Sequence, residues 1–249
     1  MSSALKKAEA EDSARASDGL GSLRSLDMAE LELREVNSTL QGAGKGENDN
    51  RWQILNPRGS HAVAVGLDVP IEVTVKGSTG YYCAGMNKTA TVHVEGSVGP
   101  GVAENMMSGT VIVDGDASQY AGATGHGGLL VIKGNASSRC GISMKGIDIV
   151  VHGNIGHMSA FMAQKGNLVV LGDAGGALGD SIYEARLFVR GSVASLGADC
   201  IEKEMRPEHL EILKDLLERA GADASPSEFK RYGSARKLYN FNIDHAGEY

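Results

Sequence analysis

The chain has 249 residues, of which 42% are hydrophobic, 5% aromatic and 22% charged, and its formal net charge is −7. These values allow one or two domains with a buried core, and the acidic balance argues against nucleic acid as the main partner. The sequence contains neither an apolar run of about 18 residues nor an apolar signal core, so we expect a soluble, cytoplasmic protein that does not enter a membrane.

The N-terminal segment, residues 1–25, is small, charged and mostly polar, which is typical of a segment that is disordered or that a partner orders. A helix is then expected to begin at Asp27. Asp27 and Glu30 have the spacing of a capping box, and Leu26 and Leu31 that of a hydrophobic staple.

The stretch 52–69 predicts a strand, a turn at residues 56–59 and a second strand. It does not follow the repeat that comes after it. We therefore assign residues 26–70 to a helix and capping strands, because an uncapped solenoid end would expose a strand edge.

A repeat of 19 residues organises the segment 71–201. Two columns, at the second and fourth residues before a repeated glycine, are wholly aliphatic. Because alternate residues of a strand face the same side, each repeat predicts one short strand with an apolar inner face that ends at a glycine turn. The predicted turn glycines are Gly77, Gly96, Gly115, Gly134, Gly153, Gly172 and Gly191.

The return path of each repeat lacks the amphipathic pattern of a crossover helix. Seven residues after every turn glycine stands a Gly or Ala, from Ala84 to Ala198, which indicates close packing. A coil that returns to its start without a helix is a solenoid. We therefore predict an all-β fold, a right-handed parallel β-helix of about seven coils of 19 residues.

The C-terminal segment 202–249 predicts a helix followed by a docking tail. Pro207 suits the first turn of a helix, and Gly221 suits its end. The tail carries Tyr232, Tyr239 and Phe241 among basic residues. Such a tail can wrap on its own solenoid or dock on another subunit, and the sequence leaves both possibilities open.

A further column, three residues before each turn glycine, must point away from the core. From the third coil onward it is an apolar stripe, which should not face water. The helix 207–220 or another chain could cover it, and we expect a partner to cover at least part of it. The predicted interface comprises this stripe and the tail aromatics: Ile112, Val131, Val150, Val169, Phe188, Tyr232, Tyr239 and Phe241.

No motif in this chain predicts a catalytic or metal site. The glycine clusters recur at one phase of the repeat, whereas a nucleotide fingerprint occurs once and opens a helix. The histidines have no metal-site spacing. Cys83, Cys140 and Cys200 form no CxxC motif, and Cys140 is better explained as a buried thiol than as one activated by Arg139.

The repeat and the segment before it resemble a known family. The return paths Gly77-Ser-Thr-Gly80 and Gly153-Asn-Ile-Gly156, the seven-coil register and the lead-in NPRGSHAVAVGL are similar to the C-terminal β-helix domain of the glutamate synthase large subunit, the GXGXG-motif family. The resemblance spans roughly residues 26–201. Three coils depart from it, because Ser118, Ser137 and Ala194 replace the second glycine of the return path.

In glutamate synthases this domain is structural and lies between an amidotransferase domain and a barrel that carries FMN and an iron–sulfur cluster. A free-standing form resembles the β-helix subunit of a split, three-subunit enzyme, as in N-methylglutamate synthase and other glutamate synthase-like enzymes. The resemblance implies a non-catalytic subunit of a hetero-oligomer that makes N-methylglutamate and ammonia from methylamine and glutamate. It implies an amidotransferase-like partner and an FMN-binding, synthase-like partner.

The same resemblance implies no cofactor in this chain, with FMN and an iron–sulfur cluster in a partner subunit. The family's catalytic and FMN-binding residues lie in the other domains, so none is assigned here. The alternatives are a β-helix subunit of a split glutamate synthase, one of formylmethanofuran dehydrogenase, and a free-standing enzyme. The lead-in argues against formylmethanofuran dehydrogenase, and the lack of clustered acids argues against a free-standing enzyme.

Overall fold

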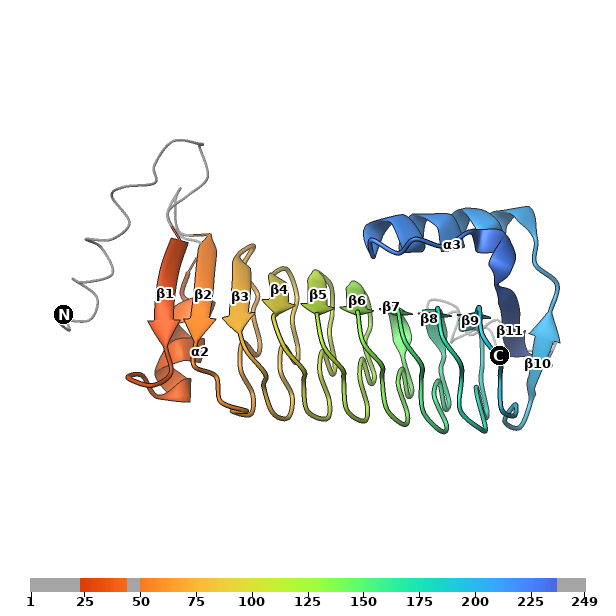
Figure 1. The fold of residues 1–249 in the computed structure, drawn as a ribbon, viewed down its shortest axis with the longest axis horizontal. Helices are drawn as coiled ribbons and strands as arrows, with labels where there is room; N and C mark the ends of the chain where they lie inside the picture. The colour runs from red at the N-terminus through yellow and green to blue at the C-terminus, as the bar shows by residue number, and fades with distance from the viewer. Residues whose placement is uncertain (1–22, 44–49, 237–249) are drawn as a thin grey trace, which may run out of the picture.

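The computed structural model describes residues 23–43 and 50–236, which form an elongated rod of stacked coils (Figure 1). The expectation for the first 22 residues, and the predicted contacts of Tyr239 and Phe241, lie outside these residues. Among the described residues, no helix combines the length and apolar character needed to cross a membrane.

The predicted parallel solenoid is confirmed, because the seven repeats each contribute one strand to a continuous parallel ladder. Val75, Val94 and Val113 are aligned partners in adjacent strands, as the 19-residue period requires. In Figure 1 the strands descend on the near side and the chain returns behind them, so the coils wind right-handed. The strands are β3 (Glu72–Lys76), β4 (Thr91–Val94), β5 (Thr110–Val113), β6 (Leu129–Ile132), β7 (Lys145–Val151), β8 (Lys165–Val170) and β9 (Arg186–Val189).

The sheet extends beyond the first repeat at its N-terminal end. β2 (Arg51–Leu55) pairs in parallel with β3, with Ile54 opposite Val75, and β1 (Leu23–Asp27) pairs in parallel with β2. The segment 52–69 is therefore a further coil and not only a cap. Its predicted second strand is absent, because residues 60–69 form a return path like those of the later coils.

The predicted helix start at Asp27 is wrong. β1 ends at Asp27, so the boundary predicted after residue 25 also falls within this strand. The Asp27 carboxylate accepts hydrogen bonds from Ala29 N at 2.8 Å and from Asn56 Nδ2 at 2.8 Å, which turns the chain after the strand. The helix α2 (Leu33–Gln41) begins later, with Glu32 and Glu35 forming its capping box.

The core of the rod is a set of aliphatic ladders inside the coils. The two columns predicted to face inward are buried along the whole stack, from Val73 and Val75 to Leu187 and Val189. At about 25 cal/mol per Å² of buried apolar surface, such ladders are the main source of stability in a rod with few aromatic residues.

The return paths pass through the left-handed region of backbone conformation at alternate residues. The φ angles of Tyr82, Ala84 and Met86 are 61°, 52° and 56°, and the corresponding residues of the next coils repeat this pattern. Their amides bond alternately to the following and preceding coils, as in Tyr82 N to Pro100 O at 2.9 Å and Ala84 N to Val63 O at 2.9 Å. From Ala84 to Gly179 the Gly/Ala column is explained by this conformation together with burial, because a larger side chain would add to the cost of a positive φ; Ala198, which is exposed and has no positive φ, does not follow this rule.

The C-terminal segment folds back onto the last coil. β10 (Cys200–Lys203) leads into α3 (Pro207–Arg219), the short 3₁₀ helix η2 (Pro226–Glu228) and β11 (Lys230–Ser234). β11 lies between β9 and β10 and is antiparallel to both. This insertion gives β9 a hydrogen-bonding partner, so the parallel stack does not end in a bare edge at that strand.

Candidate functional site

The helix α3 covers the apolar stripe on the outer face of the last coils. Val131 is 2% exposed, and Val150, Val169 and Phe188 are 0% exposed. They pack with Leu213, Leu216 and Leu217 of α3, with Ala220 directly after the helix and with Phe229.

The chain itself therefore covers these four stripe residues, and the expected cover by a partner is wrong for them. Only Ile112, at the edge of this cluster, is partly exposed. Tyr232 is also unavailable to a partner, because it is 6% exposed and packs in the core of the rod.

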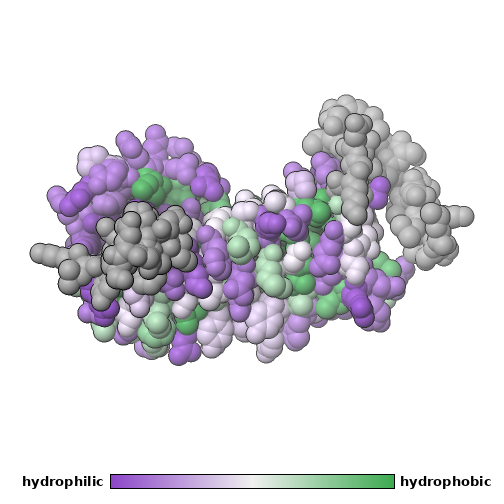
Figure 2. Space-filling view, turned by 180° about the vertical axis from the view of Figure 1, so that it is seen from behind, coloured by the Kyte–Doolittle hydropathy of each residue, from purple (hydrophilic) through white to green (hydrophobic). Residues whose placement is uncertain are grey.

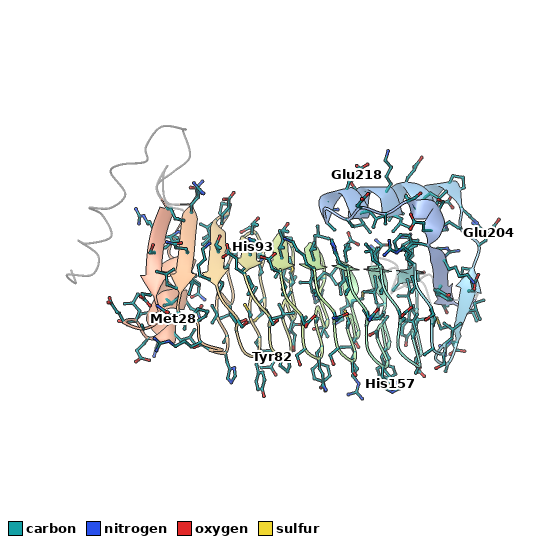
Figure 3. All side chains as sticks on the ribbon, viewed as in Figure 1. Met28, Tyr82, His93, His157, Glu204 and Glu218 are labelled. Carbon is teal, nitrogen blue, oxygen red and sulfur yellow. The ribbon has the colours of Figure 1, made fainter. Side chains whose placement is uncertain are left out.

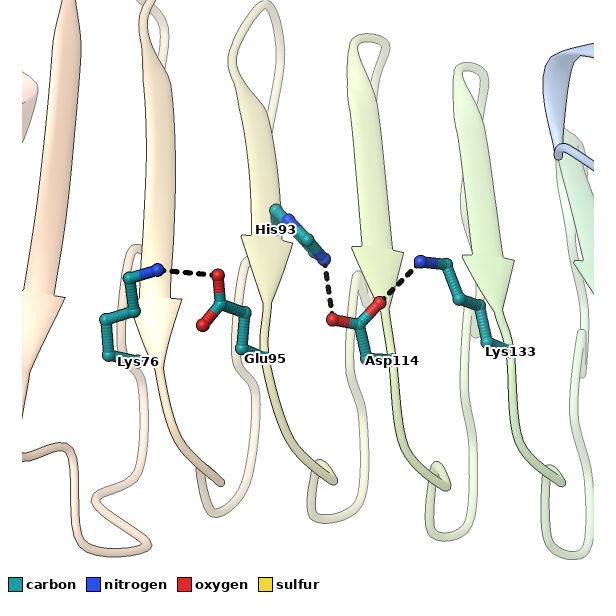
Figure 4. A network of polar contacts seen from close by, with 5 residues as sticks. All are labelled: Lys76, His93, Glu95, Asp114 and Lys133. Atoms are coloured by element: carbon teal, nitrogen blue, oxygen red, sulfur yellow. Dashed lines mark hydrogen bonds and ion pairs between the residues drawn. The ribbon is translucent and has the colours of Figure 1, made fainter.

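A polar network lies on the outer face of the sheet along β3–β6, on the N-terminal side of most of the residues that α3 covers (Figure 4). Lys76 Nζ lies 2.6 Å from Glu95 Oε1 in one pair. In a second group of contacts, Asp114 Oδ2 lies 2.9 Å from His93 Nε2, and Asp114 Oδ1 lies 2.7 Å from Lys133 Nζ. Partial burial acts to raise the pKa of Asp114, but the hydrogen bonds from Lys133 and His93 outweigh it and keep the pKa below its usual value.

The turn glycines are stacked closely on one another. A Cβ atom at Gly134 would lie 2.7 Å from Gly115 O, and one at Gly153 would lie 2.8 Å from Gly134 O. The amides of these glycines bond to the same carbonyls, at 3.1 and 2.9 Å. The glycines therefore let successive coils approach within hydrogen-bonding distance at the turn.

A second ladder follows the glycines by one residue, and the sequence reasoning missed it. Its members are all Ser, Asp or Asn, and the side-chain oxygen of each accepts a hydrogen bond from the backbone amide of its counterpart in the next coil, at 2.7 to 3.1 Å. They are Ser78, Ser97, Asp116, Asn135, Asn154, Asp173 and, as the last donor, Ser192. The restriction of this column to three short polar residue types is a signal that could have revealed it.

The cysteines are buried. Burial raises the pKa of Cys140 to about 12 and those of Cys83 and Cys200 to about 11. Thiols with such values stay protonated near neutral pH and are poor nucleophiles and metal ligands.

Two histidines have contacts that hold their rings in place. His61 stacks on Tyr81 with ring centroids 4.3 Å apart, and His152 Nε2 lies 3.2 Å from Ala220 O at the end of α3. Within residues 23–43 and 50–236, no three His, Cys, Asp or Glu side chains are grouped so that they could hold a metal ion.

An aromatic surface, which we call the tyrosine edge, lies where the coils turn away from the strands. It consists of His61, Tyr81, Tyr82, Tyr120 and Arg139. Tyr81 and Tyr82 are 49% and 52% exposed, and the Arg139 guanidinium lies 6.0 Å from the centre of the Tyr120 ring. Figure 3 shows Tyr82 and His157 pointing away from the rod along this edge.

Figure 2 shows the opposite side of the rod, seen from behind and coloured by hydropathy. On the part of that face that is not grey, hydrophobic residues form small groups separated by hydrophilic ones. Exposed Tyr and Arg side chains are typical of protein interfaces, so the tyrosine edge is the stronger candidate contact surface.

A basic cavity lies at the C-terminal end of the rod, between β9, β10 and β11. Its volume is about 240 Å³, and it is lined mainly by polar and charged groups. Four cationic side chains and one carboxylate lie around it: Arg186, Lys203, Arg231, Arg236 and Glu184.

Comparison with known proteins found a close relative. Protein GlxC of Rhizobium meliloti (strain 1021) is 73% identical over 225 residues, which cover 90% of this chain and 99% of that protein. No family model matches the chain.

Among solved structures, the chain is similar to one from the formyltransferase/hydrolase complex (FhcABCD) of Methylorubrum extorquens in complex with methylofuran. The TM-score is 0.47 and the identity 19%, over 80% of this chain and 85% of the other. A likeness at this level supports no inference about function.

Proposed function

The chain belongs to the same family as Protein GlxC, and from this premise we propose that it is a structural, non-catalytic subunit of a glutamate synthase-like complex. The specific assignment that we propose is N-methylglutamate synthase, which converts methylamine and glutamate to N-methylglutamate and ammonia. In that complex the chain would hold an amidotransferase-like subunit and an FMN-binding subunit together.

The observation that carries this proposal is the seven-strand repeat with its lead-in. The glycines, the 19-residue register and the segment 56–67 resemble the glutamate synthase β-helix domain, and all of them lie in the stacked coils. A rod in which every coil bonds to the next is rigid along its axis, which suits a part that fixes the distance between two partners.

The proposed contacts with the partners lie away from the apolar stripe, because α3 covers most of it. We assign one contact to the tyrosine edge, where the Tyr81 ring stacks on His61 and meets Tyr82 edge-on, because such rings offer apolar area at low entropic cost. Substitutions at Val150 or Val169 would disturb the packing under α3 and are poor probes of assembly.

FMN and the iron–sulfur cluster belong to a partner subunit in this proposal. The cysteines of this chain do not fit an iron–sulfur cluster, because Cys83, Cys140 and Cys200 are buried in different coils and none joins a metal-ligand group among the described residues.

Assembly can be tested by co-expressing the full chain with a candidate amidotransferase-like protein and a candidate FMN-binding protein from the same organism. We expect a complex of all three on size-exclusion chromatography, with methylamine-dependent N-methylglutamate formation. Glutamine-dependent glutamate formation would instead favour a split glutamate synthase, and molybdenum or tungsten in the complex would favour formylmethanofuran dehydrogenase.

The contact surface can be tested separately with Tyr81→Ala. We expect it to weaken assembly about tenfold or more, because it removes an exposed ring of the hot-spot type. Leu196→Ala is a matched control, since Leu196 is 37% exposed at the other end of the rod. A chain that stays monomeric in the presence of both proteins would contradict the proposed function.

A further inference from the structure

The basic cavity at the C-terminal end owes its shape to the antiparallel insertion of β11. Arg231 lies opposite Lys203 on β10 and opposite Phe188 on β9. The same register, continued along β11, brings Gly233 beside Arg186 at the start of β9. Gly233 has no side chain to fill the space that Arg186, Lys203 and Arg231 surround, and the cavity of about 240 Å³ results.

Two arginines of this cavity bond to neutral groups instead of carboxylates. Arg186 Nη1 donates to the amide oxygen of Asn167 at 3.5 Å, and Arg231 Nε donates to the carbonyl of Glu204 at 2.9 Å. Among the described residues, neither arginine forms an ion pair with an acidic side chain, whereas their neighbours do: Arg236 pairs with Asp199, and Lys230 with Glu202.

The arginines also lie close enough to repel one another. Burial lowers the pKa of Arg231, and the charges of Arg206 and Arg186 lower it further. Burial likewise lowers the pKa of His209, and the charge of Arg231 lowers it further, while the Glu208 carboxylate acts in the opposite direction on both groups. In the lining of the cavity itself, four cationic side chains stand against the single carboxylate of Glu184, although the net charge of the chain is −7.

We propose that this cavity binds a small oxoanion, a phosphate or carboxylate group, held by Arg186, Arg231 and Lys203. Guanidinium groups bind such anions through paired hydrogen bonds, and half-buried ones bind them more strongly than exposed ones. The volume accommodates several water molecules and therefore an anion of the size of phosphate or citrate. The inference is independent of the proposed function.

Isothermal titration calorimetry on the full chain tests this proposal. Inorganic phosphate and citrate are titrated in separate experiments at constant ionic strength. We expect saturable binding of at least one of them, and the stronger one identifies the source of the anionic group. Arg231→Gln and Arg186→Gln should each weaken that binding about tenfold or more, because each removes a charged pair of donors.

Two further variants separate binding from folding. Gly233→Leu should abolish binding by filling the cavity, while Gly233→Ala should fold normally, because a Cβ there meets nothing closer than Ala185 O at 3.7 Å. Lys88→Gln is the charge-matched control, since Lys88 pairs with Asp68 far from the cavity. Absence of saturable binding by both anions, or equal losses in Lys88→Gln and Arg231→Gln, would overturn the proposal.

Discussion

At the scale of single residues, the turn glycines are needed for space more than for conformation. Only Gly77 of the seven has a φ in the left-handed region, at 129°. From Gly115 onward, each is hydrogen-bonded to the glycine of the preceding coil and leaves no room for a methyl group. The sequence could predict that these positions require glycine, since the column never varies, but not which of the two reasons applies.

Gly134→Ala should therefore destabilise the rod by about 1–3 kcal/mol, the usual cost of overpacking. Its Cβ would clash with Asp116 Oδ1 and lie 2.7 Å from Gly115 O, and the backbone atom cannot move without breaking the ladder. Urea unfolding followed by circular dichroism measures the change. Gly233→Ala, which meets no atom closer than 3.7 Å, is the control, and equal midpoints for the two variants would show that the glycine stack is not tight.

We expect the titration of the Asp148 carboxyl group to make the free energy of unfolding depend on pH. It lies on β7, where Asn167 Nδ2 donates to its Oδ1 at 2.7 Å. Burial raises the pKa of Asp148, although the hydrogen bond from Asn167 and the charge of Arg219 act against this. A carboxyl group whose pKa is higher in the folded state binds more protons there, so its contribution to stability falls as pH rises from its unfolded pKa through its raised folded pKa.

Asp148→Asn removes this titration and keeps an acceptor for Asn167. We expect the variant to gain stability relative to the wild type as pH rises above about 4, the ordinary pKa of an aspartate, and to reach a constant difference near neutral pH. Thermal unfolding across the acidic range up to neutral pH gives the difference curve. A difference that shrinks with rising pH would mean that the folded-state pKa of Asp148 is lowered, not raised.

At the scale of elements, the strands could be predicted from the sequence, but the helix that covers their outer face could not. The aliphatic columns ending at Val75 and its counterparts fix the strand, its inward face and its register, because the side-chain period of a strand is two. The outer stripe from Val131 to Phe188 indicates only that something must cover it. Nothing in a local pattern distinguishes a helix of the same chain from a partner.

The predicted start of the first helix is wrong for a similar reason, because the local pattern at Asp27 is compatible with two different structures. Asp27, followed by Glu30, has the spacing of a capping box, but an aspartate that bonds to the amide two residues later also ends a strand. The choice between the two depends on β1 pairing with β2, which brings Asn56 to the Asp27 carboxylate. That contact spans 29 residues of sequence and leaves no local signal.

The packing of α3 on the stripe gives a prediction about local stability. Leu213 is 0% exposed between α3 and the sheet, so Leu213→Ala should cost about 2–5 kcal/mol in that contact. Because each coil contacts mainly its neighbours, we expect faster hydrogen exchange in α3 and in β7–β9, with little change in β3–β5. Lys214→Ala is the control on the solvent side of the same helix, where the Lys214 side chain is 69% exposed.

At the scale of the whole molecule, the rod depends on how its two ends are closed. The sequence predicted a cap for the N-terminal end only, whereas β1 and β2 continue the parallel ladder there. It could not predict that β11 would enter the sheet between β9 and β10, because this strand lies outside the repeat and runs against it. The repeat determines the body of the rod, while contacts distant in sequence determine its ends.

Deletion of residues 230–249 should therefore make the rod self-associate. Without β11, β9 loses its hydrogen-bonding partner and β10 is left unpaired, and an exposed parallel edge readily pairs with another chain. Light scattering coupled to size-exclusion chromatography should show a mass that rises with protein concentration. Deletion of residues 237–249 keeps β11 and should leave the mass unchanged. If both truncated chains self-associate, the effect belongs to residues 237–249 and not to β11. If neither does, α3 alone is enough to close this end of the rod.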